Sequence, residues 1–375
     1  MDNIIPSPCF VLDEQKLENN LSLIKHVSDQ AEVEIILAFK GFAMWSAFPI
    51  VKKYIIGATS SSLHEMMLCN EYMETKSHTY AVAYKSHEID QYIKGSSHIT
   101  FNSLGQLNQF GEKASSAGVS VGLRVNPEYS DVETDLYNPS SPTSRLGVKS
   151  DALPDKLPDY VEGLHFHVLC ESDSFALEKT LEAFEQKFGH FLPHIKWLNM
   201  GGGHLMTRKD YNTNHLIEVL KKFKAKHKIN LILEPGSAFA WQTGDLKTTI
   251  IDIVDNGGVK TAIIDASFTC HMPDCLEMPY RPNLLKGYSD SSKGNFKYRL
   301  GGVSCLAGDF LEEYSFDNEL AIGDEIQFLD MIHYTMVKTS TFNGVQHPAI
   351  GINRKNGQFD LIRTFDYEDY KRRLS

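Results

Sequence analysis

Chemically capable side chains recur in this sequence where short apolar runs end. Lys40 follows one such run, Arg124 and Glu234 close two others, and the glycines 201–203 follow a fourth. A lysine in an apolar setting can lose its proton and attack an aldehyde. Adjacent glycines let backbone N–H groups approach a phosphate, and a carboxylate can keep a pyridine nitrogen protonated. Together these residues indicate chemistry on a phosphate-bearing pyridine aldehyde.

Each of these residues also has an ordinary structural role. Lys40 could be a solvated loop lysine, the three glycines a flexible turn, and Glu234 a salt-bridged acid. His165 and His167 are two residues apart, so on a strand they point to the same side, which would also suit zinc. We place no third ligand of fitting type beside them, and we therefore expect no metal.

Parallel strands must bring these residues together, because they are far apart in the sequence. From residue 13 to about 240, β-rich runs alternate with segments of helical period, such as Glu14 to Ser28 and His215 to His227. Eight strands close a (β/α)8 barrel, whose chemistry lies at the C-terminal strand ends. The predicted strands are Ile35 to Phe39, Ile55 to Thr59, Thr79 to Ala83, His98 to Asn102, Ser120 to Val125, Gly163 to Val168, Lys196 to Met200 and Ile229 to Leu233.

The pattern changes after Gly244, where the helical period disappears and β-rich runs separated by turns follow. We therefore predict a barrel over residues 13–243 and a β domain, of sandwich or barrel type, formed by residues 1–12 and 244–375. The segment from Asn126 to Pro142 follows the fifth barrel strand and is a candidate lid. The predicted strands of the β domain are Thr248 to Val254, Thr261 to Ala266, Tyr298 to Val303, Glu325 to Leu329 and Phe359 to Arg363.

Composition bears on several classes of function. The 375 residues are 42% hydrophobic and 23% charged, which is typical of a globular enzyme. A formal net charge of -11 argues against nucleic-acid binding, because phosphate contacts need clustered Lys and Arg. Residues 1–10 show no export signal, and no run of about eighteen apolar residues is present, so we expect a cytoplasmic protein outside the membrane. The six cysteines lack CxxC spacing, which favours reduced thiols.

Four motifs resemble those of the fold type III decarboxylases that depend on pyridoxal 5'-phosphate (PLP), the family of ornithine and diaminopimelate decarboxylases. They are Ala38-Phe39-Lys40, His165-Phe166-His167-Val168, Gly201-Gly202-Gly203 and Glu234-Pro235-Gly236. The resemblance spans nearly the whole chain. It implies an alanine racemase-like TIM barrel, a β domain that begins with a strand over Pro8 to Asp13, and a homodimer with shared active sites.

The resemblance also assigns residues to the cofactor. Lys40 would form the Schiff base, His167 would stack on the ring, Glu234 would pair with the pyridine nitrogen, and Arg124 would lie beneath the cofactor. The residues expected at the phosphate are Gly202, Gly203 and Tyr334.

A second group of assignments concerns the proton and the substrate. Residues 302–309 are similar to the family's cysteine-bearing segment, which reaches into the partner's active site, so that Cys305 would return a proton to the α carbon. Asp309 stands where an acid meets the distal amine of the substrate, and Arg281 resembles a substrate-binding arginine of diaminopimelate decarboxylases. On residue type alone, Asp309 could instead cap a turn, and Arg281 could pair with surface acids. Two more candidates for amine binding are Glu277 and Glu171.

Several residues depart from the family pattern. Ser237 replaces an arginine that often follows Glu-Pro-Gly, so one phosphate contact is missing or replaced. Cys170 stands where a serine is common, and Thr59 stands where an acid often sits near the lysine. After the cysteine, Leu306 and Ala307 replace the acid and serine of diaminopimelate decarboxylases. These changes disfavour diaminopimelate as the substrate.

Four further segments resemble the branch of the family that converts carboxynorspermidine and carboxyspermidine to norspermidine and spermidine. They are residues 144–147 (Ser-Arg-Leu-Gly), 167–171 (His-Val-Leu-Cys-Glu), 270–274 (Cys-His-Met-Pro-Asp) and 276–280 (Leu-Glu-Met-Pro-Tyr). We therefore expect a step of polyamine biosynthesis. Decarboxylation of diaminopimelate, ornithine or arginine is the alternative. A non-catalytic PLP carrier or a regulatory homologue is more remote, because single-domain carriers lack the β domain and the cysteine segment. A racemase is also disfavoured, because Glu234 at the pyridine nitrogen would favour decarboxylation.

Overall fold

The chain forms two compact units in the computed structural model, which describes residues 4–132 and 135–375. The barrel unit comprises residues 20–239, and the sheet unit comprises residues 1–19 and 240–375.

Two sequence predictions extend beyond the described residues. Residues 1–3 belong to the stretch inspected for an export signal, and residues 133–134 belong to the candidate lid. The domain boundaries predicted at residues 13 and 243 stay a proposal.

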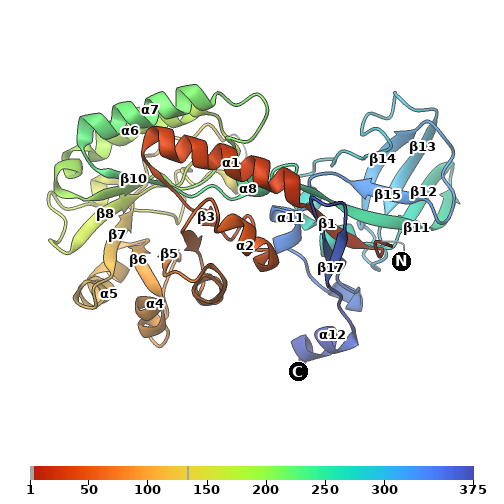
Figure 1. The fold of residues 1–375 in the computed structure, drawn as a ribbon, viewed down its shortest axis with the longest axis horizontal. Coiled ribbons are helices and arrows are strands. Elements are labelled where there is room, and N and C mark those ends of the chain that lie inside the picture. The colour runs from red at the N-terminus through yellow and green to blue at the C-terminus, as the bar shows by residue number, and fades with distance from the viewer. Residues whose placement is uncertain (1–3, 133–134) are drawn as a thin grey trace. The chain divides into compact units, whose positions relative to one another are not determined.

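A ring of parallel strands forms the centre of the barrel unit (Figure 1). The first predicted strand is split at Ile36 into β2 (Glu34–Ile35) and β3 (Leu37–Ala38). Because β2 pairs with the last strand, β10, and β3 pairs with β4, the split strand closes the ring. The predicted (β/α)8 barrel is therefore confirmed. Its other strands are β4 (Ala58–Ser60), β5 (Ser77–Tyr80), β6 (Ser96–Phe101), β7 (Ser120–Arg124), β8 (Val161–His165), β9 (Trp197–Asn199) and β10 (Asn230–Leu233).

Helices follow most of the barrel strands, and several begin at a residue whose side chain caps a backbone N–H. Ser103 accepts from Gln106 at the start of α5, and Asp173 accepts from Ala176 at the start of α6. The two helices that the apolar spacing predicts are α1 (Glu14–Ala31) and α7 (Thr213–His227). The others in this unit are α2 (Phe48–Val51), α3 (Leu63–Leu68), α4 (Ile89–Gly95), α5 (Leu104–Ser116), α6 (Ser174–Phe188) and α8 (Ser237–Ala240), which ends at the unit boundary.

The long strand β11 (Gly244–Asn256) organises the sheet unit. Its first half pairs with β1 (Cys9–Asp13) and β15 (Glu325–Phe328), and its second half pairs with β12 (Val259–Ile264). An irregularity between Ile250 and Asp252 separates the halves, as expected where one strand serves two parts of a sheet. The sheet is mixed, since β1 runs parallel to β16. Its remaining strands are β13 (Phe296–Gly301), β14 (Phe310–Phe316), β16 (Ala349–Asn353) and β17 (Phe359–Arg363).

The sequence prediction for the sheet unit is incomplete in two respects. Strands β14 and β16 were not predicted, and helices do occur after Gly244, although they are short. These helices are α9 (Phe268–His271), α10 (Pro273–Glu277), α11 (Tyr334–Val337) and α12 (Tyr367–Leu374).

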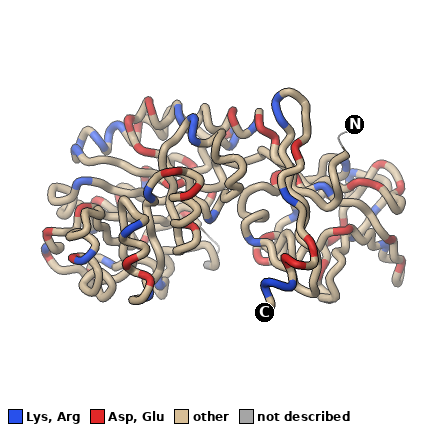
Figure 2. The backbone as a smooth tube through the Cα atoms, turned by 60° about the horizontal axis from the view of Figure 1, so that its bottom comes forward, with Lys and Arg blue, Asp and Glu red and all other residues tan. Residues whose placement is uncertain are grey.

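Charges of both signs alternate along the described chain (Figure 2). A basic run at the end of α7 is partly paired with acids: Lys224 lies 3.3 Å from Glu32, and Lys226 lies 2.7 Å from Glu185. Within the described residues, no helix has both the length and the apolar character needed to cross a membrane.

Trp197 fills the interior of the barrel opposite two glycines. Its ring packs in a buried cluster with Ile36 and Ile232, and its indole N–H donates to Ser120 Oγ at 2.9 Å. A Cβ atom at Gly163 would lie 2.0 Å from the ring, and one at Gly122 would lie 2.3 Å from it. The indole therefore fits only because two neighbouring strands carry glycine at these positions.

We expect Gly163→Ala to destabilise the protein by about 1–3 kcal/mol, because the added methyl group meets a ring held on all sides. Trp197→Leu makes room, so Gly163→Ala should cost less in that background, giving a non-additive double-mutant cycle in urea unfolding. Gly105→Ala is the control, because its Cβ atom would meet only Ser103 Oγ, at 3.9 Å. Equal effects of Gly163→Ala in both backgrounds would contradict this account.

Candidate active site

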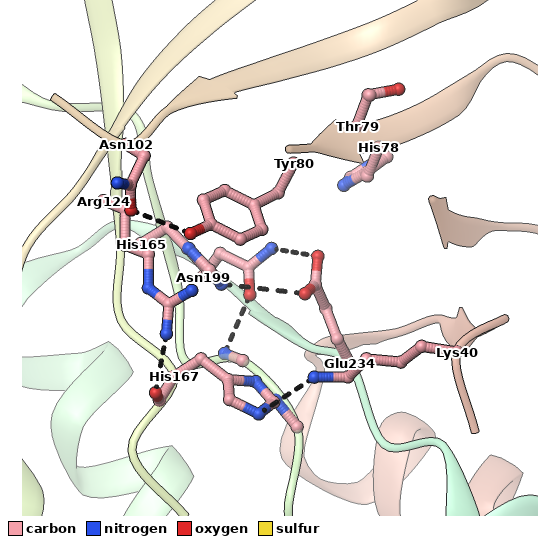
Figure 3. A network of polar contacts seen from close by, with 12 residues as sticks. Lys40, His78, Thr79, Tyr80, Asn102, Arg124, His165, His167, Asn199 and Glu234 are labelled. Carbon is pink, nitrogen blue, oxygen red and sulfur yellow. Dashed lines mark hydrogen bonds and ion pairs between the residues drawn. The ribbon is translucent and has the colours of Figure 1, made fainter. Parts of the chain in front are cut away.

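The barrel brings the predicted strand-end residues of this unit into one polar network (Figure 3). Lys40 follows β3, Arg124 ends β7, His165 ends β8, and Glu234 follows β10. Parallel strands place all these ends at one rim of the barrel.

The Lys40 side chain is exposed, and yet its pKa is lowered. Its side chain reaches solvent, yet the surrounding protein still desolvates the ammonium. This desolvation, followed by the positive charge of Arg124, lowers the pKa of Lys40, while Glu234 acts in the opposite direction. A lysine whose pKa is lowered and which remains accessible is suited to nucleophilic attack.

Glu65, at the first turn of α3, also influences the lysine electrostatically. Burial raises the pKa of Glu65, and Lys40 lowers it. Its carboxylate accepts the Ser61 N–H at 2.6 Å. Glu65 is thus an acid that favours the Lys40 ammonium, as an acid at position 59 would in the family pattern.

His167 contacts two other predicted site residues. Its Nε2 atom lies 3.2 Å from Lys40 Nζ, and its Nδ1 atom lies 2.7 Å from the backbone nitrogen of Gly202. The structure therefore brings His167, Lys40 and the glycine loop together. In this arrangement the Gly202 N–H points to the imidazole ring.

The glycine loop is tightly packed against Glu234 and the loop after β8. Gly201 has φ of 68° and Gly203 has φ of 85°, values that favour glycine. A Cβ atom at Gly202 would lie 2.4 Å from the carbonyl oxygen of Glu234, and one at Gly203 would lie 2.2 Å from that of Leu169. All three positions therefore require glycine.

Glu234 is a buried carboxylate, only 7% exposed. Asn199 Nδ2 donates to its Oε1 atom at 2.7 Å, and His165 Nε2 lies 3.7 Å from Oε2. Burial alone would raise the pKa of Glu234, but His165 and Asn199 outweigh burial and hold the pKa at about 2. Burial lowers the pKa of His165. His165 is therefore uncharged at neutral pH, and Asn199 supplies the hydrogen bond to Glu234 there.

Arg124 is buried beside the same network. Its Nη2 atom donates to the carbonyl oxygen of His167 at 3.0 Å, and its guanidinium lies 4.7 Å from the centre of the Tyr80 ring. The ring and the carbonyl oxygen both stabilise a buried cation. Arg124 therefore fixes the backbone from which the His167 side chain extends.

The described part of the candidate lid is fastened to the loop after β8. Ser130 Oγ donates to the carbonyl oxygen of Val168 at 2.6 Å, and Ser172 Oγ donates to Asp131 at 2.9 Å. Glu171 lies between Val168 and Ser172 in this loop, is exposed and has a left-handed φ of 51°. The Glu171 carbonyl oxygen accepts from Arg208 at 2.9 Å. This part of the segment braces the loop that carries Glu171.

The predicted proton donor lies in the sheet unit. Cys305 is exposed, and its backbone N–H donates to Asn343 Oδ1 at 2.8 Å. Asp309 is buried, and its two oxygens accept the N–H groups of Thr269 and Ser304, each at 2.9 Å. Asp309 thus holds the turn that presents Cys305, and any bond to a substrate amine would have to form in addition to these two.

The other predicted residues of the sheet unit also have protein partners. Arg281 donates to the carbonyl oxygens of Ser289 and Glu313, both at 2.9 Å. Glu277 forms an ion pair with Lys338 at 2.5 Å. Tyr334 is the first residue of α11.

The residues of the barrel unit fit PLP in three respects. They provide an accessible amine of lowered pKa, an ionised buried carboxylate and a glycine loop that no larger residue could replace. Within the described residues, both ring nitrogens of the buried His165 lack a hydrogen bond. The described residues contain no group of three or more His, Cys, Asp or Glu placed to hold a metal ion.

Sequence inspection missed Asn199 and Glu65. Asn199 is 4% exposed, and besides donating to Glu234 it accepts the Gly201 N–H at 2.9 Å. It ends β9 just before the glycines, so the rule that found the other strand-end residues applied to it as well. Glu65 lies on a helix, where no comparable rule pointed to it.

Comparisons with known proteins agree over almost the whole chain. Residues 9–332 match the family model described as pyridoxal-dependent decarboxylase, C-terminal sheet domain. The chain is 51% identical to carboxyaminopropylagmatine decarboxylase of Synechocystis sp. over 99% of this chain and 96% of that protein. It is 41% identical to carboxynorspermidine/carboxyspermidine decarboxylase of Campylobacter jejuni over 98% of each chain.

A solved structure of one such relative also matches this chain over nearly its full length. The crystal structure of carboxynorspermidine decarboxylase from Campylobacter jejuni, complexed with norspermidine, superposes with a TM-score of 0.92 and 41% identity. The match covers 98% of this chain and all of that chain.

We expect Asn199→Leu to destabilise the protein by about 2–4 kcal/mol at pH 7, because it removes the hydrogen bonds to Glu234 Oε1 and from the Gly201 N–H. The depressed pKa of Glu234 contributes stability above its unfolded value of about 4.3, and this contribution is lost as the pH falls through the folded value. The penalty for Asn199→Leu should therefore shrink in acid. Urea unfolding at several pH values tests this. Asn230→Leu, at an exposed position, is the control, and an equal effect of both variants would contradict the assignment.

Proposed function

Because this chain belongs to the family of pyridoxal-dependent decarboxylases, we propose that it removes the α-carboxylate from a carboxylated polyamine. The observation that carries this proposal is the agreement, over 98% or more of this chain, with relatives named for such substrates. The fit of Lys40, Glu234 and the glycine loop to PLP supports it.

We propose that the site takes PLP as its cofactor. When bound, PLP draws electrons away from the bond to the departing carboxylate. Lys40 would bond to the aldehyde carbon, and the ionised Glu234 would keep a proton on the pyridine nitrogen. His167 and Arg124 would help to hold the ring. The groups proposed for the phosphate are Gly202, Gly203 and Tyr334, with Ser237 in place of the arginine common in the family.

The proton that replaces the carboxylate would come from Cys305 Sγ. Its exposure on a turn held by Asp309 and Asn343 is consistent with presentation to another molecule. We therefore propose a homodimer in which Cys305 of one subunit serves Lys40 of the other. A cytoplasmic location is part of the same proposal.

Polyamine amines need carboxylates as partners. Glu171, exposed on the braced loop, and Glu277, exposed on α10, present carboxylates, and ion pairs with ammonium groups are the expected contacts. Asp309 and Arg281 complete the proposed substrate set. Their existing bonds to the backbone mean that they would also orient their own loops.

Carboxyaminopropylagmatine is a second candidate substrate, favoured by the 51% identity to the Synechocystis protein. It differs from carboxynorspermidine and carboxyspermidine at the end remote from the carboxylate, where a guanidinium replaces an ammonium. A guanidinium binds a carboxylate through two parallel hydrogen bonds, whereas an ammonium binds it as a point charge.

The first test measures carbon dioxide release by the PLP-loaded protein. The panel comprises carboxynorspermidine, carboxyspermidine, carboxyaminopropylagmatine, diaminopimelate, ornithine and arginine. We expect kcat/KM for a carboxylated polyamine to exceed that for the three amino acids by at least about 100-fold, because the shorter substrates cannot make the ion pairs proposed for the distal amine. Lys40→Ala should release none. Preference for an amino acid would overturn the proposed substrate, and silence across the panel would overturn the proposed activity.

The shared site can be tested by mixing inactive variants. Lys40→Ala and Cys305→Ala should each be inactive or nearly so as homodimers. Refolded as an equal mixture, they should regain up to about a quarter of the wild-type activity, because half of the dimers are mixed and each has one complete site. No recovery, although mixed dimers form, would contradict sharing between subunits.

A further inference from the structure

Gly202, His167 and Lys40 form a continuous line of hydrogen bonds. The Gly202 nitrogen lies 2.7 Å from His167 Nδ1, and His167 Nε2 lies 3.2 Å from Lys40 Nζ. Figure 3 shows the contact between the His167 imidazole and Lys40. Both ring nitrogens of His167 therefore have a hydrogen-bond partner. The Gly202 N–H is a donor, and the role of Lys40 Nζ can be deduced from it.

The Gly202 N–H determines which atom donates and which accepts in each of these two hydrogen bonds. A backbone N–H can only donate, so His167 Nδ1 accepts and carries no hydrogen. A neutral imidazole then carries its hydrogen on Nε2, which must donate to Nζ. An ammonium has no lone pair to accept with, so Nζ can take this hydrogen bond only as a neutral amine. Flipping the ring would place a carbon atom against the Gly202 N–H, which excludes the opposite assignment.

Charges around the lysine favour the same state. Burial lowers the pKa of His167 well below its ordinary value, so the ring is uncharged at neutral pH. The groups that face Lys40 from other elements are Arg124, which disfavours the ammonium, and Glu234, Cys170 and Glu65, which favour it. Desolvation is the largest influence and disfavours the ammonium.

We propose that His167, oriented by the Gly202 N–H, holds Lys40 as a neutral amine ready to react with the cofactor aldehyde. Only the neutral amine has the lone pair that forms the new bond to carbon. His167 would thus act on the lysine before the cofactor is attached, in addition to contacting the cofactor ring later. The inference rests on the proposed function for the identity of the aldehyde, but the state of the lysine can be measured without it.

The test uses the full chain stripped of cofactor. Acetic anhydride acetylates only neutral amines, so labelling at a series of pH values, with the Lys40 peptide quantified by mass spectrometry, gives the midpoint for Lys40. Lys222, exposed on α7, is the internal reference. We expect the Lys40 midpoint to lie at least about one pH unit below that of Lys222, since desolvation disfavours the ammonium.

Two variants separate the hydrogen bond from burial. His167→Leu removes the donor, and His167→Gln retains a side-chain N–H. Loss of one hydrogen bond to the neutral form should reduce the neutral fraction of Lys40 about threefold to tenfold and raise its midpoint accordingly. His167→Gln should stay closer to the wild type. An unchanged midpoint in His167→Leu, or equal shifts in both variants, would overturn the proposal.

A second measurement needs no variant. In the cofactor-free chain with 15N-labelled histidine, we expect the His167 resonances to show an unprotonated Nδ1 and a protonated Nε2. The opposite tautomer, or a doubly protonated ring at neutral pH, would overturn the proposal. Neither measurement uses a substrate. A chain that behaves as expected here but releases no carbon dioxide would therefore overturn the proposed function and leave this inference standing.

Discussion

The buried negative charge of Glu234 is the constraint on which the rest of the site depends. A carboxylate that is 7% exposed would ordinarily be protonated, because desolvation favours the neutral acid. It stays ionised because Asn199 donates to one oxygen and His165 lies near the other. Asn199 also accepts the Gly201 N–H, so the residue that stabilises the charge also fixes the start of the glycine loop. The glycine loop can approach the Glu234 backbone so closely only because it has no side chains.

Glu234 is a fixed anion and Arg124 is a fixed cation, so Lys40 is the group of the three whose charge can change. The Arg124 guanidinium, a permanent cation, is held by a carbonyl oxygen and lies against the Tyr80 ring. Its charge, together with desolvation, acts against a second cation at Lys40. The permanent charges thus belong to Glu234 and Arg124, which are not proposed to form bonds, and Lys40, the proposed nucleophile, can be neutral.

Features that depend on periodicity could be predicted from the sequence, whereas features that depend on packing could not. The barrel and its rim residues result from strands that end in polar groups, and the structure confirms that fold. Asn199 carried the same signal but was overlooked, because its role depends on Glu234, which is distant in sequence. Strand β14 contains two adjacent acids, Glu312 and Glu313, which obscure its apolar alternation. The partners of Asp309 are backbone N–H groups, which no side-chain pattern could reveal.

Chemistry and selectivity are divided between different kinds of residue. The groups proposed to act on PLP in the barrel unit are mostly buried or enclosed, and every PLP-dependent decarboxylation requires similar groups. Substrates named for the relatives differ at the far end of the molecule, where an ammonium or a guanidinium must meet a carboxylate. These two groups have equal charge but different geometry, so we propose that the orientation of acids such as Glu171 and Glu277 decides between them. The left-handed backbone of Glu171, held by the braced loop, fixes the direction of one of these proposed contacts.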